Sequence, residues 1–174
     1  MAGFGSAHAV TTDSVILTIT PVFNLSVNIS SDTCAFGLVA LKSSVSVCIG
    51  KIMNDGDVTS AWQKQSANAA SGGVAWTLKT SGSTGKDEFR LLAVATGTGV
   101  SPTFSGTAGN SCVLGDATGI NVTDAFTELT EGGASSPVHP LGETRDLWVS
   151  IMMPTNVSAA TMQTITLSVR AVNR

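Results

Sequence analysis

Charged residues are scarce in this chain, and so are aromatic ones. Only 12% of its 174 residues are Asp, Glu, Lys or Arg, and it has three Trp, six Phe and no Tyr. An average soluble domain carries about 25% charged residues. The nine Lys and Arg form no cluster, so the basic surface that nucleic acids require is missing. We therefore expect few solvated charged faces and no nucleic-acid partner.

Long hydrophobic runs are also absent. No apolar stretch reaches the roughly 20 residues of a membrane-spanning helix, so membrane insertion is not expected. The content of Val, Ile, Leu and Phe is too high, and the net charge of −3 too small, for a disordered chain. A chain of this length buries about two-thirds of its unfolded surface when it folds. These properties favour one folded domain that does not need disulfide bonds to fold.

What the chain does have is Ser, Thr, Val, Ala and 18 Gly. Thr and Val favour strands because their branched side chains fit a pleated sheet. Low charge combined with this composition indicates a β-rich protein that is secreted and extracellular, at a cell surface. Its surface either meets other protein or is simply rich in hydroxyl groups, and composition leaves both interpretations open.

The most informative segment is residues 15–29. Apolar residues occupy its odd positions, and polar ones occupy most of the even positions, which is the period of a half-buried strand. These apolar residues are Val15, Leu17, Ile19, Phe23, Leu25, Val27 and Ile29. As one strand the segment would be roughly 50 Å long at about 3.3 Å per residue, against about 17–20 Å for an ordinary strand. A single domain cannot cover it as one straight strand.

Pro21 interrupts this segment and removes a backbone donor. Two interpretations follow. The chain either bends at Pro21, so that its halves join two sheets of one domain, or residues 14–20 add a strand to a neighbouring subunit. In the second case Val15, Leu17 and Ile19 form a donor strand at a subunit interface.

Further strands are predicted by alternation and by turn residues between them. An Asn-Asp-Gly-Asp turn ends at Asp57, and Trp62 and Trp76 are expected as core anchors. The last two strands are expected to form a hairpin joined by residues 154–160. Residues 97–119 and 130–143 are expected to be loops. The predicted strands after residue 29 are 45–49, 58–65, 74–79, 88–96, 147–153 and 165–171, and residues 120–129 are expected to be a further strand or a short helix, with a strand favoured.

Several of these short motifs resemble immunoglobulin-like β-sandwich domains of microbial cell-surface and filament proteins. The motifs are Ala-Phe-Gly-Leu-Val at 35–39, Lys-Ile-Met-Asn-Asp-Gly-Asp at 51–57 with Trp62 after it, Leu-Trp at 147–148 and Gln-Thr-Ile-Thr-Leu-Ser-Val at 163–169. The resemblance covers most of residues 20–172, with the loops between 97 and 143 unmatched. It implies a scaffold, an adhesin or a fibre subunit.

Together these observations predict an all-β fold, an Ig-like antiparallel β-sandwich with an extended N-terminal strand. Residues 1–13 are expected to be a flexible tail, residues 14–20 the extended strand and candidate donor, and residues 21–174 the sandwich domain.

The three cysteines are the first candidates for chemistry. Cys34 and Cys48 are in mirror positions about residue 41, so neighbouring strands would bring them close enough for a disulfide. Cys112 is left over in the long loop and is either an intermolecular bridge or a free thiol. This pair of cysteines is not part of the resemblance.

No catalytic, cofactor-binding or metal site is expected. The two histidines, His8 and His139, are far apart, and no Gly-x-Ser-x-Gly motif presents a nucleophile. Three Cys and two His lack the paired spacing of a zinc site. His139 is expected to be a loop histidine, and Asp55 and Asp57 to be turn residues. The chain is therefore not expected to be an enzyme.

Three functions remain. The first is a structural subunit of an extracellular filament or surface assembly that polymerises head-to-tail with copies of itself by strand addition. The second is a secreted carbohydrate-binding or adhesive module that binds surface glycans through an exposed Trp, with Trp62, Trp76 and Trp148 as candidates. Core positions suit these tryptophans better. The third is a viral capsid or tail protein.

Overall fold

The computed structural model describes residues 18–20, 22–31, 33–79, 82–104, 112–113, 127–128 and 138–173, with the side chains of 112–113 and 127–128 left aside. Over these residues the fold is all-β and contains no helix. Its strands are β1 (Asn28–Ile29), β2 (Ser44–Met53), β3 (Ser60–Ser66), β4 (Ala70–Ser71), β5 (Thr77–Leu78), β6 (Glu88–Thr96), β7 (Cys112–Val113), β8 (Thr127–Glu128), β9 (Thr144–Met152), β10 (Gln163–Thr164) and β11 (Leu167–Asn173).

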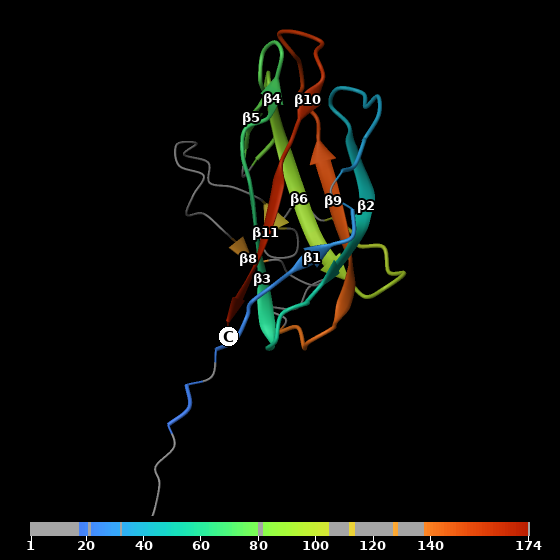
Figure 1. The fold of residues 1–174 in the computed structure, drawn as a ribbon. Helices are drawn as coiled ribbons and strands as arrows, with labels where there is room; N and C mark the ends of the chain where they lie inside the picture. The colour runs from blue at the N-terminus through green and yellow to red at the C-terminus, as the bar shows by residue number, and fades with distance from the viewer. Residues whose placement is uncertain are drawn as a thin grey trace, which may run out of the picture.

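The strands form one large sheet and two small ones (Figure 1). The six-stranded sheet has the order β1-β2-β9-β6-β5, with β7 also paired to β6. It is mixed, because β5 and β6 are parallel and the other pairs are antiparallel. The three-stranded sheet has the order β11-β3-β8, and β10 pairs with β4.

Burial differs between the central and the outer strands. In β6 every side chain after Glu88 is buried, which agrees with the nearly continuous apolar run of this strand. In β2 and β11 exposed and half-buried positions alternate, and the half-buried residues are the apolar ones. The strands predicted near 45–49, 58–65, 88–96 and 147–153 are confirmed as β2, β3, β6 and β9.

One hydrophobic core is shared by the large and the three-stranded sheets. Trp62 of β3, Phe89 of β6 and Leu147 of β9 are buried in the same cluster. Trp76 belongs to it too, so both predicted core tryptophans are confirmed. The apolar residues of β2 and β11 pack against this cluster but stay partly exposed.

A buried polar contact joins β3 to the residues before β9. The His139 ring stacks on Trp62, with 3.6 Å between ring centroids and an interplanar angle of 11°. His139 and Ser60 also exchange two backbone hydrogen bonds of 2.7 and 3.1 Å. Asn54, fully buried, donates to the carbonyls of His139 and Val58 at 2.7 and 2.9 Å. We call these contacts of Asn54, Trp62 and His139 the polar junction.

Two predictions are corrected. Among the described residues between 15 and 29, only Asn28–Ile29 is a strand. The last two long strands are not a hairpin, because β9 pairs with β2 and β6, whereas β11 pairs with β3. The connection from 153 to 166 therefore crosses between sheets. His139 lies outside the named strands, as predicted, and its side chain is fully buried.

We expect His139→Ala to lower the free energy of unfolding by about 2–4 kcal/mol. The change removes a buried ring from its stack on Trp62 and leaves a cavity. Urea denaturation followed by tryptophan fluorescence measures the change. The matched control is Leu141→Ala in the same loop, whose side chain is 63% exposed and whose removal should cost less than about 0.5 kcal/mol. Equal effects of the two changes would show that the stack does not stabilise the fold.

Candidate subunit interface

Apolar side chains in the described part of the N-terminal segment are exposed to solvent. Ile19 is 84% exposed, Val22 94% and Phe23 48%. The other two predicted donor residues, Val15 and Leu17, lie outside the described residues. In one of the two interpretations, the residues before Pro21 join a sheet of their own domain. Ile19 is not covered by its own subunit, so that interpretation is wrong for Ile19.

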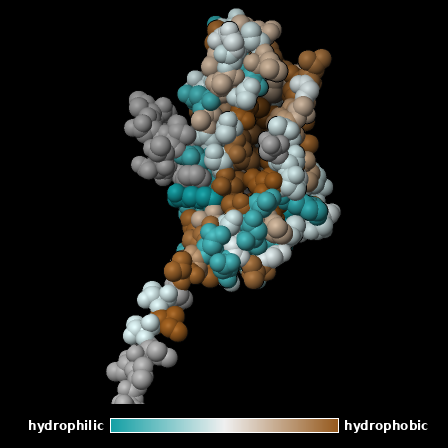
Figure 2. All heavy atoms as spheres, in the orientation of Figure 1, coloured by the Kyte–Doolittle hydropathy of each residue, from teal (hydrophilic) through white to brown (hydrophobic). Residues whose placement is uncertain are grey.

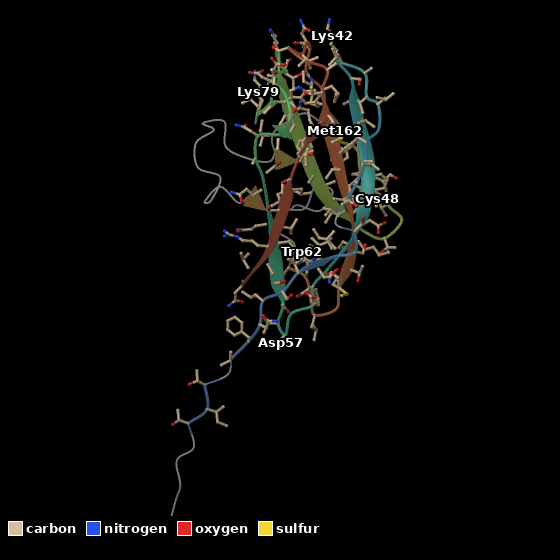
Figure 3. The ribbon with its side chains drawn as sticks, turned by 45° about the horizontal axis from the view of Figure 1, so that its top comes forward. Lys42, Cys48, Asp57, Trp62, Lys79 and Met162 are labelled. Carbon is tan, nitrogen blue, oxygen red and sulfur yellow. The ribbon has the colours of Figure 1, made fainter. Side chains whose placement is uncertain are left out.

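The place where this segment leaves the domain is fixed by hydrogen bonds. Asn24 accepts a backbone bond from Asp57 at 2.9 Å, and its own N–H donates to the Asp57 carboxylate at 3.3 Å. Asp57 lies at the lower end of the domain (Figure 3). Beyond Asn24, residues 18–20 and 22–23 continue away from the body of the protein (Figure 1).

Two long strands have a partner on one side only among the described residues. β11 pairs with β3 along its whole length, and no described backbone group pairs with its other edge. β2 pairs with β9 throughout, and β1 covers its other edge only at Ile52 and Met53. Edges of this kind carry unpaired N–H and C=O groups that can accept another strand.

Near a β-bulge, the edge of β2 that faces away from β9 is already hydrogen-bonded to the residues that follow β1. The register with β9 shifts between Cys48 and Gly50, and Gly50 has a φ of 145°. A Cβ at this position would lie 2.9 Å from the hydroxyl oxygen of Ser30, so glycine is required. Ser30 also donates its N–H to the Lys51 carbonyl and accepts the Lys51 N–H, both at 2.8 Å. The unpaired edge of β2 is therefore confined to residues 44–50.

Hydrophobic side chains gather between β11 and β2 on the face shown in Figure 2. The residues beside this strip are partly buried rows of the two strands that pack against the core, together with Phe36 and Val39 of the connection to β2. The row of β2 is Val45, Val47 and Ile49, and the row of β11 is Leu167, Val169 and Ala171. We call this surface the apolar strip.

The sequence predicts Cys34 and Cys48 on two neighbouring strands, and the structure does not place them so. Cys48 is opposite Trp148 of β9, and Cys34 lies in no strand, so the predicted pairing of neighbouring strands around residue 41 is wrong. Both thiols are free and exposed. A disulfide between them stays a prediction. Cys112 pairs with Ala93 through β7, and its side chain lies outside what the structure describes.

Three carboxylates are held ionised by neighbouring donors. The side chain and backbone N–H of Ser158 donate to Asp87 at 2.5 and 2.6 Å, and these bonds lower the pKa of Asp87. The pKa of Glu88 is lowered by Lys79, at 3.0 Å, and by the Gly85 N–H, at 2.7 Å.

Asp146 lies at the pairing of β2 with β9. It accepts the Gly99 N–H at 2.6 Å and pairs with Lys51 at 3.2 Å, and both interactions lower its pKa. Lys51 and Asp146 are directly opposite each other in the sheet register. These ion pairs lie at the periphery and connect strands, and they do not converge on a common centre.

Neither a metal-binding group nor a membrane-spanning helix is found in the part of the chain that the structure describes. Comparisons with protein-family models, curated proteins and solved structures gave no match.

We expect a thiol-specific maleimide to modify Cys34 and Cys48 in the folded protein without denaturant, because both thiols are free and exposed. Mass spectrometry of the digested protein gives the extent of labelling at each residue. A disulfide-linked peptide that contains both cysteines would instead establish the bridge.

We expect stability to be constant above about pH 5 and to fall as the pH drops towards about 2. The ordinary pKa values are 3.8 for Asp87 and Asp146 and 4.5 for Glu88, and the folded state holds all three lower. The unfolded chain therefore binds protons first, and the stabilisation is lost as the folded carboxylates become protonated. Urea midpoints measured across this range give the slope. The triple variant D87N/E88Q/D146N should have a shallower slope, and an unchanged slope would contradict the assignment.

Proposed function

We propose that this protein is a structural subunit of an extracellular filament or surface assembly, and that copies of it polymerise head-to-tail by strand addition. The observation that carries the proposal is the exposure of Ile19, 84%, on a segment that leaves the domain. The proposed fold is an Ig-like sandwich, supported by the core that the large and three-stranded sheets share.

The physical argument is the cost of leaving this segment uncovered. Each apolar side chain in water costs about 25 cal/mol for every Å² that burial would remove. The subunit itself offers Ile19 almost no cover. A strand that carries alternating apolar residues gains both hydrophobic burial and main-chain hydrogen bonds when it pairs with an open sheet edge.

Such a contact is heterologous, because the donor segment and the acceptor edge are different surfaces. Heterologous contacts that do not close into a ring propagate into filaments. The low proportion of charged residues, 12%, fits a surface that is partly covered by other subunits. The proposed location is outside the cell, at the cell surface.

The alternative functions have weaker support. A glycan platform needs an exposed aromatic ring, but Trp62 and Trp76 are buried and Trp148 is only half-exposed. A viral capsid or tail protein would also self-assemble. Negative-stain microscopy distinguishes filaments, closed shells and monomers, and filaments are the expected result.

We expect Ile19→Asp to abolish assembly while the subunit stays folded. Because Ile19 is 84% exposed, the charge adds little cost to the isolated subunit, but it would have to be buried in the proposed contact. Sedimentation velocity and electron microscopy measure assembly, and circular dichroism reports the fold. The matched control is Val22→Asp, an exposed apolar residue beyond the donor residues 14–20.

The control should assemble like the wild type. Filaments of the Ile19→Asp variant that match those of the wild type would refute strand addition through residues 14–20. Loss of assembly in both variants would show that general hydrophobicity of the segment, rather than the donor strand, drives association.

A further inference from the structure

We infer that the acceptor of the donor strand is the outer edge of β11 in a second copy, where Val15, Leu17 and Ile19 cover the apolar strip. This inference rests on the proposed function and adds the acceptor site to it. Residues 14–20 would become a fourth strand beside the order β11-β3-β8.

The open edge of β11 matches the donor in length. β11 spans Leu167–Asn173, seven residues, which is also the number in residues 14–20. All seven pair with β3, and among the described residues none pairs on the other side. In the antiparallel register that keeps the odd donor residues beside Leu167, Val169 and Ala171, residues 14–19 lie opposite residues 172–167 and cover nearly the whole strand.

The burial pattern of β11 also matches. Leu167, Val169 and Ala171 are half-buried and pack against the core, whereas Ser168 and Arg170 are exposed. Side chains of directly paired residues point to the same face of a sheet. With its odd residues facing the core and an antiparallel register, the donor would place Leu17 beside Val169, Ile19 beside Leu167 and Thr18 beside Ser168 on the exposed face.

The three donor side chains would then enter between two apolar rows. One row belongs to β11, and the other is Val45, Val47 and Ile49 of β2. Figure 2 shows hydrophobic surface between these strands. Burial of both partly exposed rows supplies a hydrophobic gain that an isolated sheet edge lacks.

The edge of β2 is a less suitable acceptor. Ser30 already bonds Lys51 at one end of that edge, and Phe36 and Val39 of the connection to β2 pack against the core. The edge of β11 has no comparable closure among the described residues.

The donor segment of a subunit does not run along the edge of β11 in that same subunit. Asn24 is bonded to Asp57 just before β3, and β3 begins where β11 ends, with Ser60 opposite Asn173. From that end of the domain residues 18–20 continue outward and not back along β11 (Figure 1). The occupant is therefore the segment of a second copy.

Disulfide trapping in the full-length chain tests this acceptor. In a background with Cys34, Cys48 and Cys112 replaced by Ser, we introduce Thr18→Cys together with Ser168→Cys. Assembly under mild oxidation should give a ladder of covalent multimers on a non-reducing gel. Each single variant can give no species larger than a dimer.

The matched control pairs Thr18→Cys with Ser46→Cys. Ser46 is an exposed serine on the open edge of β2, so it differs from Ser168 in strand and not in chemistry. It should give no ladder.

Each other outcome overturns the inference. A ladder with Ser46→Cys but not Ser168→Cys would assign the acceptor to β2. A disulfide within one chain would place the donor in its own subunit. No cross-link in filaments whose formation still requires Ile19 would move the acceptor elsewhere and leave the proposed function intact. Filaments that form regardless of Ile19→Asp would remove the proposed function as well.

Discussion

The polar junction is the constraint on which the arrangement of the rest depends. Asn54 is fully buried, so its side-chain groups must be paired, and they bond the carbonyls of Val58 and His139 and the N–H of Gly56. The stack of His139 on Trp62 joins the same loop to β3. Because Asp57 in this turn also bonds Asn24, one small region connects the sheets and sets where the N-terminal segment departs.

Away from the polar junction, the core is covered unevenly. β6 and β9 are buried within the large sheet, whereas the apolar rows of β2 and β11 stay half-exposed at its flank. The ion pairs add little to this picture, since exposed pairs contribute about 0–1 kcal/mol. Among the described residues the central strands are well packed and two strand edges are open, so the domain still has apolar surface to bury by association. The proposed strand addition uses both properties.

The alternation of residues 45–49 and the apolar run of 88–96 predicted β2 and β6 because side-chain period follows directly from strand geometry. The same reasoning failed for the described residues between 18 and 27, where apolar residues alternate without a strand. The predicted hairpin of the last two strands failed because proximity in sequence does not determine pairing. The burial of His139 was not predicted, because a single histidine between Val138 and Pro140 gives no periodic indication of burial. Its distant partners, Asn54 and Trp62, are brought to it only by the fold.

The sequence by itself determined the class of structure, all-β, the tryptophans of the core and the apolar character of the N-terminal segment. These properties depend on residue type and local period. Tertiary structure alone decided that β9 and β11 belong to different sheets, that Cys48 lies opposite Trp148 while Cys34 lies in no strand, and that Ile19 is uncovered. Each of these facts depends on hydrogen bonds and packing between residues far apart in the chain, for which local pattern carries no information.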